Sequence, residues 1–204
     1  MKKNTFNGIL YGASGSLWWG TIGVIYFKSS SFAGPIELVV HRTIWTAFSL
    51  IITTSLFSKW DSFFKIIKRK KEMFYLLITG ILIFTNWSTW IYAVVTNKII
   101  DASFGYFIMP ILSVFFGILF LKEKISTTTL IAIIIAAAGI IFMSFDSKGE
   151  GTLFGLINGL LSSLGFAGFT VSLRWRKNTP KFTTVAIAGI FCSAVAILVL
   201  LFND

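Results

Sequence analysis

The chain has 204 residues, of which 55% are hydrophobic and only 13% are charged, and its mean hydropathy is +0.83. Soluble domains carry about a quarter charged residues, so this composition excludes an ordinary soluble domain and predicts a polytopic membrane protein. The single cysteine, Cys192, and the single histidine, His41, exclude an intrachain disulfide and a multi-histidine metal site. We therefore expect no metal and no other cofactor.

Seven apolar stretches predict an all-α membrane protein with seven transmembrane helices and short loops. They fall at residues 7–27, 36–57, 73–95, 101–121, 126–145, 152–173 and 182–202. Lys2 and Lys3, followed by an apolar run, also fit a signal peptide with a weak cleavage site at Ser31-Phe32-Ala33. The first stretch is long for a signal peptide and contains two tryptophans, which favours a retained helix.

The basic residues sort to one side of the predicted membrane. With the N-terminus inside, fourteen of the 18 Lys and Arg residues lie in cytoplasmic segments, three lie outside, and Arg42 lies within a span. The positive-inside rule therefore predicts a cytoplasmic N-terminus. The same arrangement explains the formal charge of +10 without a nucleic-acid partner, and the run Lys68–Lys71 suits anionic lipid headgroups.

Small residues recur at every fourth position in the first and sixth stretches, a spacing that lets helix backbones pack closely in lipid. The two ladders are Gly8, Gly12, Ser16, Gly20 and Gly151, Gly155, Gly159, Ser163. Their constant offset of 143 residues suggests a five-helix repeat whose second copy is inverted. Chance similarity between glycine-rich helices is the alternative. The second copy stops after two helices, so the chain is either a fragment or a seven-helix variant that needs a partner.

The second stretch carries an unusual polar group. Glu37, His41 and Trp45 are four residues apart and share a helix face, with Arg42 beside them. An arginine within the membrane should face the bundle interior or a water-filled cavity. This pattern favours a substrate-anion or proton-coupling site. In the alternative interpretation, Glu37 only complements the helix dipole, and Arg42 and His41 only hold helices together.

The third and fourth stretches each present one polar stripe. Asn86 and Trp90 share a face of the third, where amides and indoles suit an amphipathic solute. Ser103, Tyr106 and Pro110 share a face of the fourth, and Pro110 should kink or locally unwind the helix. A kinked packing helix is the alternative for the fourth stretch, and interface anchoring is the alternative for the aromatic residues of the third.

We expect these faces to meet. A buried arginine, a proline-freed carbonyl and inward amides are satisfied together if three helices surround one water-accessible space. The cavity would then be lined by Arg42, His41, Asn86, Trp90, Tyr106 and Pro110. No hydrolase triad, HExxH motif or phosphate-binding loop is evident, so an enzyme is not predicted.

At these residues the chain resembles the EamA-type permeases of the drug/metabolite transporter superfamily, and its first half is similar to RarD-type chloramphenicol-sensitivity proteins. The matching segments are Glu37 to Trp45, Asn86-Trp87 with Ala93-Val94, residues 102–110, Gly117 to Glu123, and Ala136 to Gly139. The resemblance implies ten helices in two inverted repeats around a central cavity. Residues 1–146 would form the first EamA repeat and residues 150–204 the start of the second, with Glu123 as a motif glutamate.

The resemblance implies a secondary transporter of small organic solutes or drugs in the bacterial inner membrane. It would work by alternating access, and export is one direction considered. The expected partners are the solute, the lipid bilayer, and either further copies of the chain or missing C-terminal helices. A seven-helix membrane binding or sensory protein without transport activity is the alternative.

Overall fold

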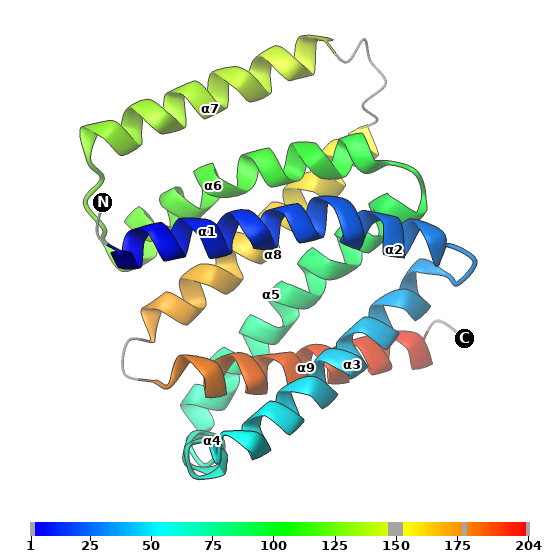
Figure 1. Ribbon diagram of the computed structural model, residues 1–204, viewed down its shortest axis with the longest axis vertical. Helices are drawn as coiled ribbons and strands as arrows, with labels where there is room; N and C mark the ends of the chain where they lie inside the picture. The colour runs from blue at the N-terminus through cyan, green and yellow to red at the C-terminus, as the bar shows by residue number, and fades with distance from the viewer. Residues whose placement is uncertain (1–2, 147–152, 177–178, 203–204) are drawn as a thin grey trace.

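The structure is a computed structural model that describes residues 3–146, 153–176 and 179–202. Every regular element within these ranges is a helix, which confirms the predicted all-α class (Figure 1). The elements are α1 (Lys3–Trp18), the π-helical turn η1 (Trp19–Gly23), α2 (Val24–Ser29), α3 (Pro35–Leu56), α4 (Trp60–Ile67), α5 (Lys70–Val95), α6 (Ile99–Leu121), α7 (Thr127–Asp146), α8 (Leu153–Trp175) and α9 (Lys181–Leu201).

Within the part of the chain that the structure describes, three helices are long and apolar enough to cross a membrane, namely α3, α5 and the segment Phe182–Leu201 of α9. Phe107–Leu121 and Thr127–Phe142 are shorter apolar helices among the described residues. These lengths fit a multi-pass membrane protein, because an apolar helix of about 20 residues matches the hydrocarbon thickness. The count of seven spans and the repeat organisation remain predictions.

The segment after α3, predicted as a cytoplasmic loop, contains the short helix α4. Its aromatic side chains gather on one side, where the Trp60 ring lies 5.3 Å from Phe63 and 5.7 Å from Phe64 between centroids. Ile66 is buried, whereas Asp61 and Lys65 are exposed. The high charge of the segment favoured a loop in the prediction. Its amphipathic pattern is typical of a helix lying at a membrane surface.

The best-packed part of the molecule centres on α5, which lies against α8 and α9, while α8 also packs along α6 and α9 along α3 (Figure 1). Glycines allow these approaches. A Cβ at Gly165 of α8 would lie 2.6 Å from the Leu82 carbonyl oxygen of α5, and one at Gly80 would lie 2.8 Å from the Cβ of Phe191. Close backbone contact is how helices associate in lipid, where burial of apolar surface offers little.

Polar side chains bridge the same helices. Asn86 Nδ2 donates to both the carbonyl oxygen and Oγ of Ser162 at 2.9 Å, and Asn158 Nδ2 donates to the Thr89 carbonyl oxygen at 2.9 Å. Ser193 Oγ donates to the Thr43 carbonyl oxygen at 2.7 Å and so joins α9 to α3. These bonds satisfy polar groups that lipid cannot solvate.

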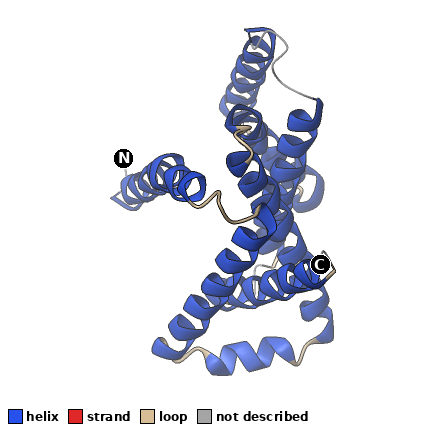
Figure 2. Ribbon diagram, turned by 90° about the vertical axis from the view of Figure 1, so that its right-hand side faces the viewer, coloured by secondary structure: helices blue, strands red, loops and turns tan. Residues whose placement is uncertain are grey.

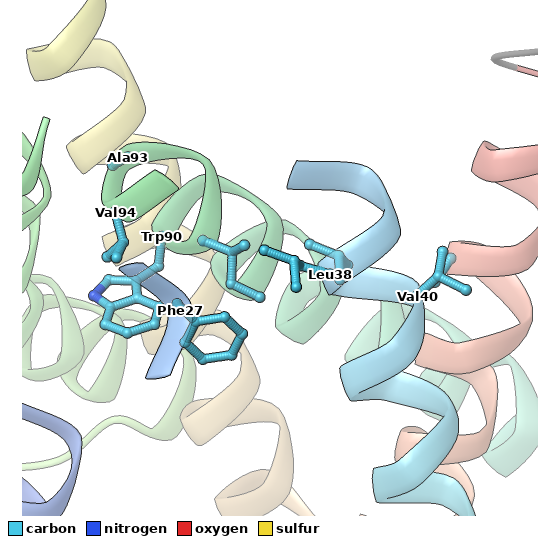
Figure 3. Close-up of a cluster of buried hydrophobic side chains, with 9 residues drawn as sticks. Phe27, Leu38, Val40, Trp90, Ala93 and Val94 are labelled. Carbon is cyan, nitrogen blue, oxygen red and sulfur yellow. The ribbon is translucent and has the colours of Figure 1, made fainter. Parts of the chain in front are cut away.

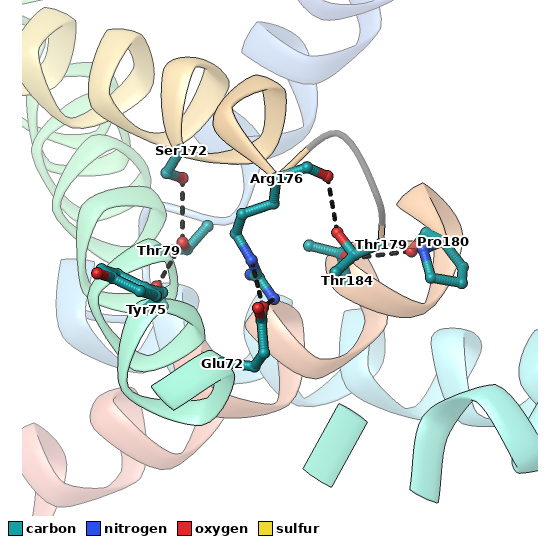
Figure 4. Close-up of polar contacts among 8 residues, drawn as sticks. All are labelled: Glu72, Tyr75, Thr79, Ser172, Arg176, Thr179, Pro180 and Thr184. Carbon is teal, nitrogen blue, oxygen red and sulfur yellow. Dashed lines mark hydrogen bonds and ion pairs between the residues drawn. The ribbon is translucent and has the colours of Figure 1, made fainter. Parts of the chain in front are cut away.

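Charged groups from α8 and the residue after it hold one end of the bundle together. Arg176 pairs with Glu72 at the start of α5, its Nε donating to Oε2 at 2.8 Å (Figure 4). Half a turn away, Arg174 pairs with Glu123 just beyond α6. The predicted motif glutamate therefore lies at a helix–helix junction.

The glycine ladder of the first stretch, predicted as a packing face, meets no other helix among the described residues. Helix α1 projects away from the bundle (Figure 2), and every side chain from Phe6 to Ile22 is exposed. Outside the local helix, no described atom lies within 4 Å of a Cβ built at Gly12 or Gly20, and Ser16 is exposed. The spacing predicts a helix face without large side chains, but such a face is packed only where another helix lies against it.

The second ladder belongs to the packed region. Gly159 and Ser163 of α8 are buried, and Ser163 Oγ donates to the Gly159 carbonyl oxygen at 2.8 Å. Gly151 lies outside the described residues, and so do the surroundings of Gly155. Two sequence ladders with the same spacing thus have different environments.

Candidate functional site

Arg42, in the second turn of α3, is held between aromatic rings from three other elements. Its guanidinium carbon lies 4.4 Å from the ring centroid of Trp19 in η1 and 4.1 Å from that of Trp87 in α5. The ring of Phe27 in α2 lies 5.6 Å away. Each such contact contributes about 0.5–2 kcal/mol, depending on desolvation. The rings thereby stabilise a charge that would be costly in lipid.

The π-helical turn positions Trp19 for this contact. A π-turn adds one residue to the helical turn, so it rotates the side chains of the first stretch relative to a continuous α-helix. Gly23 is also required, because a Cβ there would lie 2.7 Å from Cε3 of Trp19. The ring of Trp19 therefore lies over the bare Cα of Gly23.

A further ring, that of Trp90, packs against the rings beside Arg42. Trp90 of α5 meets Trp19 edge-to-face at 5.9 Å and Phe27 edge-to-face at 5.5 Å between centroids. Figure 3 shows Trp90 and Phe27 side by side in the hydrophobic cluster, near Leu38 of α3. Trp90 is buried and packs against two of the three rings that contact Arg42.

These groups border a half-open pocket of about 880 Å³ between η1, α2 and α3. The volume is that of a site for a small organic molecule. Most of the lining is aromatic or aliphatic, with a few polar groups. The lining residues are Trp18, Trp19, Ile22, Gly23, Tyr26, Phe27, Ser30, Phe32, Ala33, Glu37, Leu38, His41, Arg42, Trp45, Thr46, Ser49, Leu50 and Trp87.

The four candidates predicted on the second stretch all line this pocket: Glu37, His41, Arg42 and Trp45. His41 Nε2 lies 3.8 Å from Glu37 Oε1, and both side chains are more than half exposed. Trp45 is 64% exposed. Their common face follows from the helical spacing, since positions three and four apart are neighbours on an α-helix.

Asn86, predicted to share a cavity with Arg42, is not among the residues lining this pocket. Its amide points to α8 and donates both of its hydrogen bonds to Ser162. Trp90, predicted as a lining residue, lies behind the wall rather than in it. In α5 Asn86 meets α8, whereas Trp87, one position on, contacts Arg42, because neighbouring positions on an α-helix point in different directions.

Two of the predicted residues of the fourth stretch, Ser103 and Pro110, lie outside this pocket. Ser103 Oγ donates to the Ile99 carbonyl oxygen of its own helix at 2.9 Å. Pro110 is exposed, and α6 stays helical through it, so the local unwinding considered above does not occur. The side chain of Tyr106 lies outside the described residues. Neither Ser103 nor Pro110 is among the residues lining the pocket.

Three residues in contact with Arg42 were not predicted as site residues: Trp19, Phe27 and Trp87. The paired tryptophans of the first stretch and the mid-span position of Trp87 were the available signals. Their role was not deducible, because the π-turn changes which face of the first helix carries Trp19. Among the described residues, no group of three or more His, Cys, Asp or Glu side chains could hold a metal ion.

Comparison with known families assigns the chain. The EamA-like transporter family matches residues 6–145, which is most of the sequence. The chain belongs to this family. The match covers the elements that build the pocket, from η1 to α5, and it supports a membrane transporter in general terms.

Named relatives agree. An uncharacterized transporter of Vibrio cholerae is 34% identical over 139 residues, covering 68% of this chain and 46% of the relative. Protein RarD of Escherichia coli is 30% identical over 166 residues, covering 81% and 55%. YojE of Bacillus subtilis, also an uncharacterized transporter, is 34% identical over 145 residues, covering 70% and 48%. The chain thus spans about half the length of the relatives it matches, and no solved structure matches it.

Proposed function

We propose that this EamA-family protein moves small organic solutes across the bacterial inner membrane and binds them in the pocket beside Arg42. The observation that carries the proposal is the caged guanidinium: a permanent charge, held by aromatic rings from three elements, borders a space of about 880 Å³. A solely structural arginine would not need a solute-sized space beside it. The π-helical turn η1 interrupts the regular helix beside this space. Transporters place binding groups at interruptions of this kind.

The proposal includes an orientation. With the N-terminus in the cytoplasm, Glu37 near the start of α3 lies toward the outside, and the Glu72–Arg176 and Glu123–Arg174 pairs lie at the cytoplasmic end. The pocket is then accessible from outside while the opposite end is held by ion pairs. This arrangement is one of the two states that alternating access requires.

Cysteine labelling tests the orientation in a Cys192→Ala background. Ser31→Cys, between α2 and α3, should react with a membrane-impermeant maleimide added to intact cells, and Asp61→Cys in α4 should react only after permeabilisation. Both native side chains are exposed. Labelling of Asp61→Cys in intact cells would show the opposite orientation.

Solute profiling tests the transport. Cells expressing the chain, Arg42→Gln or no protein should be compared by mass spectrometry of intracellular and extracellular solutes. We expect the chain to redistribute a set of solutes and Arg42→Gln to abolish the change. Arg69→Gln, which removes an exposed arginine outside the pocket, is the matched control and should behave like the unaltered chain. Profiles identical to those of empty cells would contradict the proposal.

A further inference from the structure

We infer that the pocket selects organic anions with a flat aromatic body, Arg42 binding the anionic group and Trp45 the ring. The inference rests on the proposed function, since it names the solute class for the same pocket. It needs two separate features on neighbouring positions of α3: a sheltered positive charge and an exposed aromatic face.

The charge is presented in a restricted geometry. The guanidinium carbon of Arg42 lies 4.4 and 4.1 Å from the ring centroids of Trp19 and Trp87, and Arg42 also lines the pocket. A guanidinium presents its N–H groups along its planar edge. That edge matches the two oxygens of a carboxylate, or of a phosphate or sulfonate, in a way that a neutral or cationic group does not.

The opposing charge in the pocket is weaker in effect. The Glu37 side chain is 56% exposed and lies beside His41, whereas Arg42 is half-buried among rings. Solvent screens an exposed carboxylate more than a sheltered guanidinium, because the effective dielectric constant falls on burial. Five residues along a helix also place the two groups about 7.5 Å apart in rise. The pocket should therefore favour anions over cations near Arg42.

The aromatic preference comes from Trp45. It lies three residues after Arg42, a spacing that makes the two side chains neighbours on the helix surface. Its indole lines the pocket with 64% of its surface exposed and meets Phe48 edge-to-face, with ring planes at 82°. A flat ring can lie on this indole while its attached acid group reaches Arg42. Ring stacking of this kind favours aromatic over saturated bodies.

Four probes of similar size separate the two determinants in binding measurements on the purified chain in nanodiscs. They are 2-naphthoate, 2-naphthylmethanol, 2-naphthylmethylammonium and decahydronaphthalene-2-carboxylate. We expect 2-naphthoate to bind at least tenfold more tightly than the alcohol or the cation, and about threefold to tenfold more tightly than the saturated acid.

Substitutions then assign each preference. Arg42→Gln should remove the preference for the acid over the alcohol, and Arg42→Lys should keep part of it. Trp45→Leu should equalise the aromatic and saturated acids while keeping the preference for an anion. Arg69→Gln is the control for general charge and should leave all the ratios unchanged.

Several outcomes would overturn the inference. These are equal or tighter binding of the cation, no binding of any probe, or an unchanged aromatic preference in Trp45→Leu. If Arg42→Gln does not fold, the four probes on the unaltered chain and on Trp45→Leu still decide. Loss of solute redistribution in Arg42→Gln cells, together with no anion preference in vitro, would reject this solute class and leave the transport proposal standing. Anion binding without any redistribution would do the reverse.

Discussion

The two glycine-rich helices α1 and α8 invite comparison, because their sequences carry ladders of small residues with the same spacing and their environments differ. In α8 the ladder residues Gly159 and Ser163 are buried, and Gly165, two positions beyond the ladder, lies against the backbone of α5. In α1 the ladder faces no described atom outside its own helix within 4 Å. Small-residue spacing therefore reports that a close approach is allowed, and the neighbouring helix determines whether it occurs.

The contrast extends to the two sides of the molecule. The α5–α8–α9 side is closely packed and cross-linked by amide and hydroxyl hydrogen bonds. The side of η1, α2 and α3 is built from aromatic rings around one arginine and leaves a pocket. A rigid packed side beside a looser aromatic side suits a protein that must bind a solute without losing its fold.

Gly165→Leu should have the largest effect on this comparison. A Cβ at this position would lie 2.6 Å from the Leu82 carbonyl oxygen and 3.0 Å from the backbone nitrogen of Asn86, so a leucine must separate α8 from α5. Overpacking costs about 1–3 kcal/mol even where side chains can move aside, and the α5 backbone cannot move aside in this way. We therefore expect loss of most of the folded protein, which the yield from size-exclusion chromatography in detergent measures. A normal yield would show that the α5–α8 contact is dispensable.

Asn86→Leu should come next. It removes both hydrogen bonds to Ser162 but leaves a side chain of similar volume. Interhelical hydrogen bonds in membranes contribute about 0.6 kcal/mol on average and up to about 1.7, so we expect a destabilisation of about 1–2 kcal/mol. Thermal unfolding in detergent gives the value, and Ser162→Ala should give a smaller one because the Ser162 carbonyl still accepts. An unchanged melting temperature, with solute binding impaired, would place Asn86 at the solute after all.

Gly23→Ala should act on the aromatic side alone. The new methyl group would displace the Trp19 ring from its place beside Arg42, which weakens a contact of about 0.5–2 kcal/mol. We expect a changed tryptophan fluorescence spectrum and weaker solute binding with the fold retained. Gly20→Ala is the matched control, because a Cβ there meets nothing within 4 Å. Equal behaviour of the two variants would show that Trp19 does not depend on Gly23.

Gly12→Leu should have the smallest effect. The α1 ladder faces open space, so within this chain the added side chain displaces nothing. We expect a change in the free energy of unfolding of about 0.5 kcal/mol or less. If this substitution lowers the folded yield as strongly as Gly165→Leu does, then α1 packs in the membrane against a helix beyond the described residues, and the two ladders are equivalent.

Several features of the site were predictable from individual residues. The cost of a charge in lipid was enough to predict that Arg42 would be sheltered, and the period of the α-helix placed Glu37, His41 and Trp45 with it. Asn86 was expected to face inward and is buried, but its partner was not predictable. Several polar groups can satisfy one amide, and the choice of Ser162 depends on how α5 and α8 lie together.

The sequence by itself determined the helical class and the approximate positions of the long apolar helices, because a long apolar run in lipid can satisfy its backbone only as a helix. It also determined that Arg42 must have partners. Only the tertiary structure decided that those partners are Trp19, Phe27 and Trp87, that α8 is packed, and that α1 stands apart. The reason is physical: periodicity specifies which face of a helix is polar, small or aromatic, whereas the pairing of faces depends on the π-turn and on contacts between residues distant in the chain.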